Sequence, residues 1–121
     1  KSNKIVFLEV PEKEDFYEFV SELGVTDGLP VVPPTVKKVR EMMKTTSLPP
    51  HHSLGKCPPN YREVEVGLVA VNAVMAGCLP KHFPVVIAAV EAILDPVFGL
   101  HGNSATTMGA TPLLIVNGPI R

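Results

Sequence analysis

Two long apolar runs, residues 65–80 and 83–94, dominate the pattern of hydrophobic and polar positions along the chain. A helix that is hydrophobic on all sides is normally buried among other elements, so the pattern predicts two buried apolar helices that lie side by side. Asn72 is the polar side chain inside the first run, and Cys78 lies at the junction of the two runs. Because a buried amide without partners costs about 1–3 kcal/mol, we expect Asn72 to bind nearby backbone or to face a ligand.

Two amphipathic helices are predicted ahead of these runs. Residues 12–23 carry apolar side chains at positions i, i+3, i+4 and i+7, and Gly24 is placed as a C-terminal stop. Thr35 is placed as the N-cap of a second helix, which runs through residue 44. Each helix therefore presents one apolar face to a core.

Short strands are predicted at residues 4–10, 29–32 and 111–117, with the alternative that residues 4–10 form an arm that pairs with another chain. The last of these reads TPLLIVN, and its continuous apolar run fits a strand that is covered on both faces. Residues 45–61 are predicted to form a long irregular connection, because their prolines bar helix. The elements together predict an α/β fold, with α+β as the alternative, in a single domain that spans residues 1–121.

The charge and composition of the chain exclude several kinds of partner and setting. The net charge is -1 at neutral pH and no basic cluster is present, so we expect binding to neither nucleic acid nor a membrane surface. Two cysteines, no secretory h-region and no apolar run of about 18 residues are typical of a soluble, cytoplasmic protein with free thiols. With 45% hydrophobic and 19% charged residues, the chain is expected to be globular.

Cys78 is the candidate nucleophile or proton donor. It follows Gly77 at the expected end of the first apolar helix, with Lys81 and His82 close behind. A nearby cation favours a reactive thiolate, whereas the negative end of a helix dipole disfavours it. Cysteine is also among the residues that are most often simply buried. A reactive thiol and an inert buried thiol therefore both remain open.

The histidines and cysteines raise the question of a metal site. His51, His52, Cys57, Cys78 and His82 are residue types that bind zinc, iron or copper. Their spacing matches no paired-ligand motif such as two CxxC units, so no metal site is predicted, and His51, Cys57 and His82 stay weak candidates. The alternative is that the loop histidines are solvated. The sequence specifies no cofactor.

Polar loops are candidates for substrate binding. One contains Asp27 and Gly28, a pair that also predicts a turn, and another contains Thr106 and Thr107, while Asn117 ends the last predicted strand. Such segments present N–H and hydroxyl groups that hold an anion or a carboxylate, or they form hydrogen-bonded turns. The chain has no GxGxxG, GxxxxGKS/T or GxSxG string, so nucleotide binding and nucleophile-elbow hydrolysis lose support.

Four strings, in order, resemble a poorly characterised bacterial family. They read TDGLPVVPPT, VAVNAVMAGCLP, PVVIAAVEAIL and ATTMGATPLLIVNGPI, at residues 26–35, 69–80, 84–94 and 105–120. Members of that family are associated with proteins that bear a selenocysteine-or-cysteine, glycine, serine, cysteine (UGSC) motif. Its longer members continue past the last string with a glycine- and asparagine-rich region, so this chain resembles only their N-terminal part. The resemblance implies one subunit of a heteromeric enzyme, or a fragment of one.

Three functions follow as hypotheses. In the first, the chain is a catalytic subunit of lyase or hydrolase type that acts on a small molecule at a carbon–heteroatom bond. Cys78 is then the nucleophile or proton donor, Asp27 the acid or base, and Asn72 orients the substrate with Thr106 and Thr107. Of these, Asp27, Asn72 and Cys78 match the strings of the family. In the second hypothesis the chain is a metal-binding subunit. In the third it is a non-catalytic assembly subunit, whose apolar helices contact a second protein subunit in an oligomer.

Overall fold

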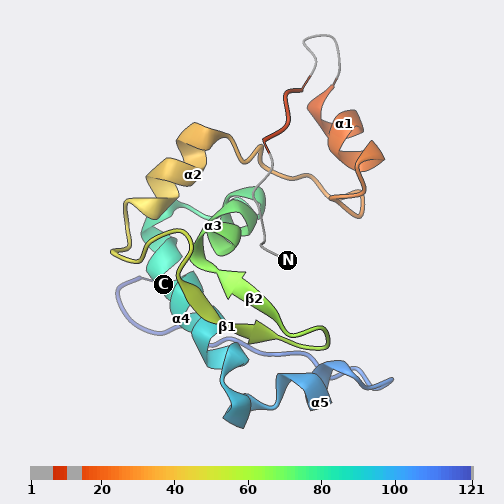
Figure 1. Ribbon diagram of the computed structural model, residues 1–121, viewed down its shortest axis with the longest axis vertical. Coiled ribbons are helices and arrows are strands. Elements are labelled where there is room, and N and C mark those ends of the chain that lie inside the picture. The colour runs from red at the N-terminus through yellow and green to blue at the C-terminus, as the bar shows by residue number, and fades with distance from the viewer. Residues whose placement is uncertain (1–6, 11–14, 121) are drawn as a thin grey trace.

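The computed structural model describes residues 7–10 and 15–120. Over these residues it combines helices with one small antiparallel sheet (Figure 1). None of the helices in that part of the chain is both long and apolar enough to cross a membrane. In chain order, the elements are α1 (Phe16–Glu22), α2 (Val36–Met43), β1 (Ser53–Cys57), β2 (Arg62–Glu65), α3 (Val66–Met75), the 3-10 turn η1 (Pro80–His82), α4 (Phe83–Leu94), the 3-10 turn η2 (Pro96–Phe98) and α5 (Leu100–Ser104).

The first two helices begin at side chains that bind free backbone N–H groups. The Asp15 carboxylate accepts two N–H groups of the first turn of α1, at 2.8 and 3.3 Å, and Thr35 Oγ1 accepts one of α2 at 3.3 Å. Gly24 follows α1 with φ of +65°, a left-handed conformation typical of helix ends. The predicted N-cap and the predicted stop are confirmed, while residues 12–14 of the first predicted helix lie outside the described chain.

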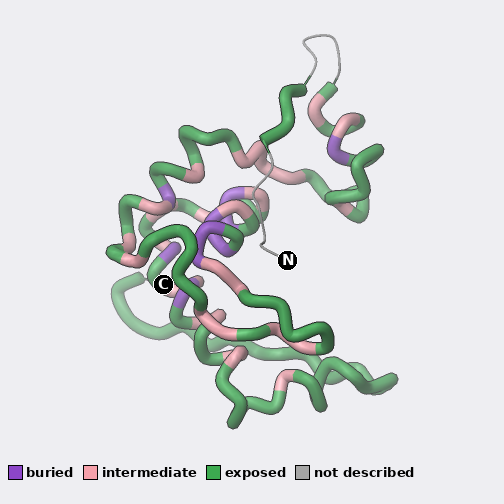
Figure 2. Tube along the Cα trace, viewed as in Figure 1, coloured by how far each residue is buried: buried purple, intermediate pink, exposed green. Residues whose placement is uncertain are grey.

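The core lies where α3 packs against both α2 and α4. Buried positions concentrate on α3 and on the parts of α2 and α4 that face it (Figure 2). Met42 and Phe83 are almost fully enclosed, at 1% and 0% exposure. Enclosing one large apolar side chain stabilises a fold by about 1.5–3 kcal/mol, so these contacts hold the three helices together. The buried cluster comprises Met42, Val66, Val69, Ala70, Ala73, Val74, Phe83 and Ile87.

The prediction of two helices buried on all sides is not confirmed. In α4, Phe83 and Ile87 are buried, and the remaining residues are half-buried or exposed. In α3, Leu68 and Asn72 are exposed. The described chain offers too few elements to cover both helices, because α4 packs mainly against α3 and β1. The hydrophobic pattern of a helix therefore did not predict which of its sides other elements pack against.

A β-hairpin replaces part of the irregular connection predicted for residues 45–61. β1 and β2 pair antiparallel, with Lys56 opposite Glu63 and an irregularity in register between Ser53 and Lys56. The Lys56 ammonium lies 3.7 Å from the Glu63 carboxylate, and the Ser53 hydroxyl donates to the same carboxylate. The pattern missed β1 because glycine and lysine are weak strand formers and its support from β2 and α4 is non-local. The antiparallel pairing favours the α+β alternative.

The other predicted strands are not formed within the described residues. Residues 7–10, the described part of the first, lack strand pairing, and the rest of that strand lies outside the description. Residues 29–32 approach the end of α3, where the Val32 N–H donates to the Met75 carbonyl at 2.9 Å. Residues 111–117 are irregular. A strand needs a partner for its backbone groups, and neither β1 nor β2 pairs with these segments.

Candidate functional site

Cys78 lies just beyond the C-terminal end of α3, where the helix closes in a Schellman motif. The Cys78 N–H donates to the Ala73 carbonyl and the Gly77 N–H to the Val74 carbonyl, both at 2.9 Å. Gly77, with φ of +80°, supplies the left-handed residue of the motif. The Cys78 side chain is half-buried and packs against the buried cluster. It forms the apolar contact that commonly accompanies this kind of helix end.

Asn72 lies on the exposed side of α3 rather than in the core. Its Nδ2 donates to the Leu68 carbonyl, one turn earlier in the same helix, at 2.9 Å. We predicted that Asn72 either binds nearby backbone or faces a ligand. It binds backbone, and that backbone belongs to its own helix. The expected burial is wrong, because no element of the described chain covers this side of α3.

Asp27 and Gly28 form the predicted turn. The Asp27 carboxylate accepts the Leu29 N–H at 3.3 Å, and the Thr26 hydroxyl donates to the Leu29 carbonyl at 2.7 Å. Gly28 has φ of +100°, which a residue with a Cβ rarely adopts. Asp27 is exposed, and its carboxylate closes its own turn.

The polar residues of the last loop are all exposed. Thr106 Oγ1 accepts the Met108 N–H at 3.1 Å in a local turn. Thr107 and Asn117 lie on either side of residues 111–116, an exposed and mostly apolar segment. Among the residues described, no hydrogen bond or ion pair joins Cys78 to Asn72, Asp27 or this loop, so the catalytic and substrate-binding roles of these residues stay predictions.

The weak metal candidates lie on separate elements. His51 is an exposed loop residue, and His82 is half-buried at the end of η1. Cys57, at the end of β1, is half-buried, and its thiol donates to the Pro58 carbonyl at 3.4 Å. Over residues 7–10 and 15–120, no three His, Cys, Asp or Glu side chains gather closely enough to hold an ion.

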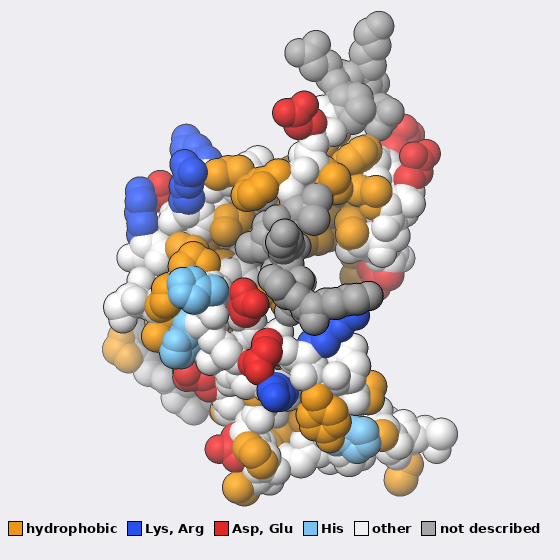
Figure 3. Space-filling view, viewed as in Figure 1, with side chains coloured by type: hydrophobic (Ala, Val, Ile, Leu, Met, Phe, Trp, Pro, Cys, Tyr) orange, Lys and Arg blue, Asp and Glu red, His pale blue; other side chains and the backbone are white. Residues whose placement is uncertain are grey.

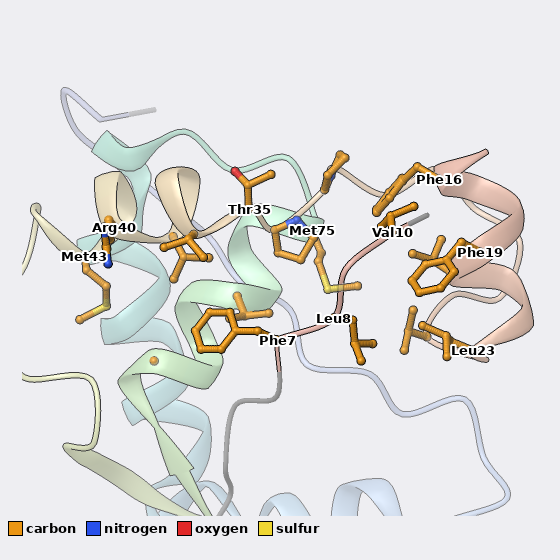
Figure 4. A pocket seen from close by; sticks show the side chains of 18 of the residues that line it. Phe7, Leu8, Val10, Phe16, Phe19, Leu23, Thr35, Arg40, Met43 and Met75 are labelled. Atoms are coloured by element: carbon orange, nitrogen blue, oxygen red, sulfur yellow. The ribbon is translucent and has the colours of Figure 1, made fainter. Parts of the chain in front are cut away.

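An apolar cleft lies between α1, α2 and α3, with a volume of about 820 Å³. In Figure 4, the α1 side chains lie at one end of the cleft, those of α2 at the other, and the segment 7–10 crosses the middle. The hydrophobic pattern of each helix taken singly could not predict this cleft, because its walls come from segments far apart in sequence. Side chains that line it include Phe7, Phe16, Phe19, Leu23, Met43 and Met75.

A second hollow of about 710 Å³ lies between the hairpin and the end of α4. Tyr61 and His101 stack at its edge, with ring centroids 6.2 Å apart and an interplanar angle of 16°. Lys56 and Glu91 also line it. Its polar residues come from β1, the hairpin turn, α4 and α5, and no local spacing in the sequence links them.

The α2 end of the apolar cleft is rich in cations. Arg40 and Lys44 line it, and no Asp or Glu is among the described side chains that do. A hydrogen bond from Lys44, followed by the charge of that ammonium, lowers the pKa of the Glu41 carboxyl below its usual range. The Lys44 ammonium and the Glu41 carboxylate are 2.7 Å apart. Both are exposed, so solvent and salt screen their attraction.

The comparisons with known proteins add no assignment. No protein-family model matches the chain, and neither a curated protein nor a solved structure matches it. The family suggested by the four sequence strings therefore stays a prediction.

Proposed function

We propose that the chain is an assembly subunit of a heteromeric enzyme that acts on a small molecule, and that residues 111–116 form its main contact with the partner subunit. One observation carries the proposal. Four consecutive apolar side chains, Leu113, Leu114, Ile115 and Val116, are exposed by 83, 54, 76 and 44%. Contiguous apolar surface of this kind is typical of a site where protein binds protein.

The backbone of this segment supports the same proposal. Between described residues, no backbone–backbone hydrogen bond involves residues 111–116. The C=O groups of residues 111–116 and their N–H groups, which Pro112 lacks, thus have no backbone partner among the described residues, and the side chains of residues 113–116 are exposed. Adding the segment as a strand to the edge of another sheet satisfies the backbone groups, and apolar cover on both faces of that sheet removes the side chains from water.

The catalytic alternative has less geometric support. Cys78 packs against the buried cluster, Asn72 binds its own helix and Asp27 closes its own turn. Lyase or hydrolase chemistry at a carbon–heteroatom bond is thus proposed for the whole assembly rather than for this chain alone. The partner subunit, in this proposal, supplies most of the reacting groups.

A variant pair tests the proposal. Replacing Leu113 and Ile115 together by Glu places two charges in the proposed contact, whereas Val97→Glu changes an apolar side chain on η2 that is 95% exposed. We expect the double variant to lose the complex with a partner subunit isolated from the native cell, measured by size-exclusion chromatography with light scattering. The Val97→Glu control retains the complex.

Two outcomes would contradict the proposal. In the first, the double Glu variant binds the isolated partner as tightly as the unmodified chain does. In the second, the unmodified chain alone turns over small-molecule substrates at the rate of the complex, which would return catalysis to this chain.

A further inference from the structure

We propose that the apolar cleft binds one long-chain fatty acid, with its hydrocarbon chain between α1 and α2 and its carboxylate beside Arg40. The volume of about 820 Å³ lies within the range of about 300–1,000 Å³ that is usual for small-molecule sites. The cleft shares no lining residue with residues 111–116, so this proposal does not depend on the assembly function.

The walls of the cleft leave apolar surface in contact with water. Phe7, Leu23 and Val36 line it and are exposed by 74, 46 and 43%. Removing apolar surface from water stabilises a complex in proportion to the area removed. Met43 and Met75 also line the cleft, and the flexible methionine side chain adapts to ligands of different shape. A hydrocarbon chain therefore matches these walls.

The position of the polar groups decides the kind of ligand. Thr35, Arg40 and Lys44 are the polar side chains among the described residues that line the cleft, and all belong to α2 or its caps. Pro33 and Pro34 line it as well and offer no N–H. A ligand with polar groups along its length would leave most of them unpaired, at a cost in binding. A ligand with one polar head at the α2 end avoids this cost.

The charge at that end favours an anionic head. Arg40 makes no ion pair with the described residues, whereas Lys44 is bound to Glu41 at 2.7 Å. Lys37 and Lys38 lie on the same helix but do not line the cleft, and Figure 3 shows the blue side chains gathered over α2. In Figure 4, Arg40 lies at the α2 end of the cleft. Its guanidinium suits a carboxylate, which it can bind through two N–H groups.

Displacement of a fluorescent fatty acid tests the proposal. The full chain is titrated with cis-parinaric acid below its micelle concentration, and the probe is displaced with palmitate or with palmityl alcohol, which has the same chain without the charge. We expect saturable binding of one probe per chain. Arg40→Gln should weaken palmitate by about two- to fivefold, as expected for an exposed ion pair, and leave palmityl alcohol unchanged.

Matched variants separate the cleft from the general charge of α2. Lys38→Gln removes a cation of the same helix that does not line the cleft, so palmitate binding should not change. Val36→Trp and Leu23→Trp add bulk to the cleft from α2 and from the end of α1, at exposed positions, and each should abolish saturable binding of both competitors. Circular dichroism checks that these variants keep their helices. If one of them unfolds, the other still tests the proposal.

Three results would overturn the proposal. One is the absence of saturable binding by the probe. Another is an equal effect of Arg40→Gln and Lys38→Gln on palmitate, because the charge would then act from a distance. The third is dimerisation that Val36→Trp prevents and palmitate does not, which would make a second copy of the chain the occupant.

Discussion

The thiol of Cys78 is the candidate nucleophile that the sequence predicts, and it also belongs to the Schellman motif that ends α3. These two settings have different consequences. A structural thiol contributes through its contact with the buried cluster, so its replacement alters stability. A nucleophile contributes to the reaction, so its replacement alters turnover while stability changes little.

Cys78→Ser separates the two roles. The hydroxyl is more polar than the thiol in a half-buried apolar setting, so the free energy of unfolding should fall by about 1–2 kcal/mol. Urea denaturation followed by circular dichroism measures the change. If Cys78 is structural, the assembled complex keeps its turnover rate, and a loss of turnover at full complex formation would instead establish a nucleophile.

Cys57→Ser is the matched control. Cys57 is also half-buried, but its thiol donates to the Pro58 carbonyl at 3.4 Å, and a hydroxyl can donate in the same way. We therefore expect a smaller loss of stability than for Cys78→Ser. Equal losses would show that the contact of Cys78 with the cluster is not what makes the difference.

At the scale of elements, the hairpin depends on the close approach of β1 to α4. Gly55 has φ of +140°, and a Cβ at this position would lie 3.1 Å from the Leu94 Cβ. The residue therefore meets two requirements that only glycine satisfies easily, an uncommon backbone conformation and the absence of a side chain. Gly55 thus allows the sheet to pack closely against α4.

Gly55→Ala should lower the free energy of unfolding by about 1–3 kcal/mol, because the strained backbone and the contact with Leu94 act together. Urea denaturation measures it. Gly102→Ala in α5 is the control, since nothing lies within 4 Å of the added Cβ, and we expect no loss and a gain of up to about 1 kcal/mol. A Gly55→Ala variant as stable as the unmodified chain would show that β1 does not need this close approach.

At the scale of the whole molecule, α1 stands apart from the buried cluster. Its buried residue, Val20, is not a member of the cluster formed by α2, α3 and α4. The apolar cleft lies between α1 and the other two helices. Few buried contacts correspond to a low free energy of local opening. We therefore infer that α1 opens more readily than the rest of the described fold.

Hydrogen exchange tests this inference. The hydrogen-bonded amides of α1 should exchange at least about tenfold faster than those of α3, which corresponds to a difference of about 1.4 kcal/mol in the free energy of opening. Mass spectrometry of peptide fragments measures both helices in the same sample, so α3 serves as the internal reference. Equal protection of α1 and α3 would place α1 within the same cooperative unit as the core.

The features that local sequence predicted are those that local contacts determine. The Thr35 cap, the stop at Gly24 and the helix end at Gly77 each depend on groups within a few residues. Those parts of the fold were predictable for that reason. The hairpin, by contrast, joins weak strand formers through pairing across a turn, so the pattern along β1 alone carried little signal.

The candidate site divides in the same way. The sequence by itself determined which residues are candidates for chemistry, Cys78, Asp27 and Asn72 among them, because that depends only on residue type. Only the tertiary structure decided that these three line neither the apolar cleft nor the hollow beside the hairpin, and that α4 leaves part of its surface uncovered by the described residues. The physical reason is that burial and hollows arise from segments distant in sequence, and a hydrophobic pattern states which surfaces need cover without stating which partner covers them.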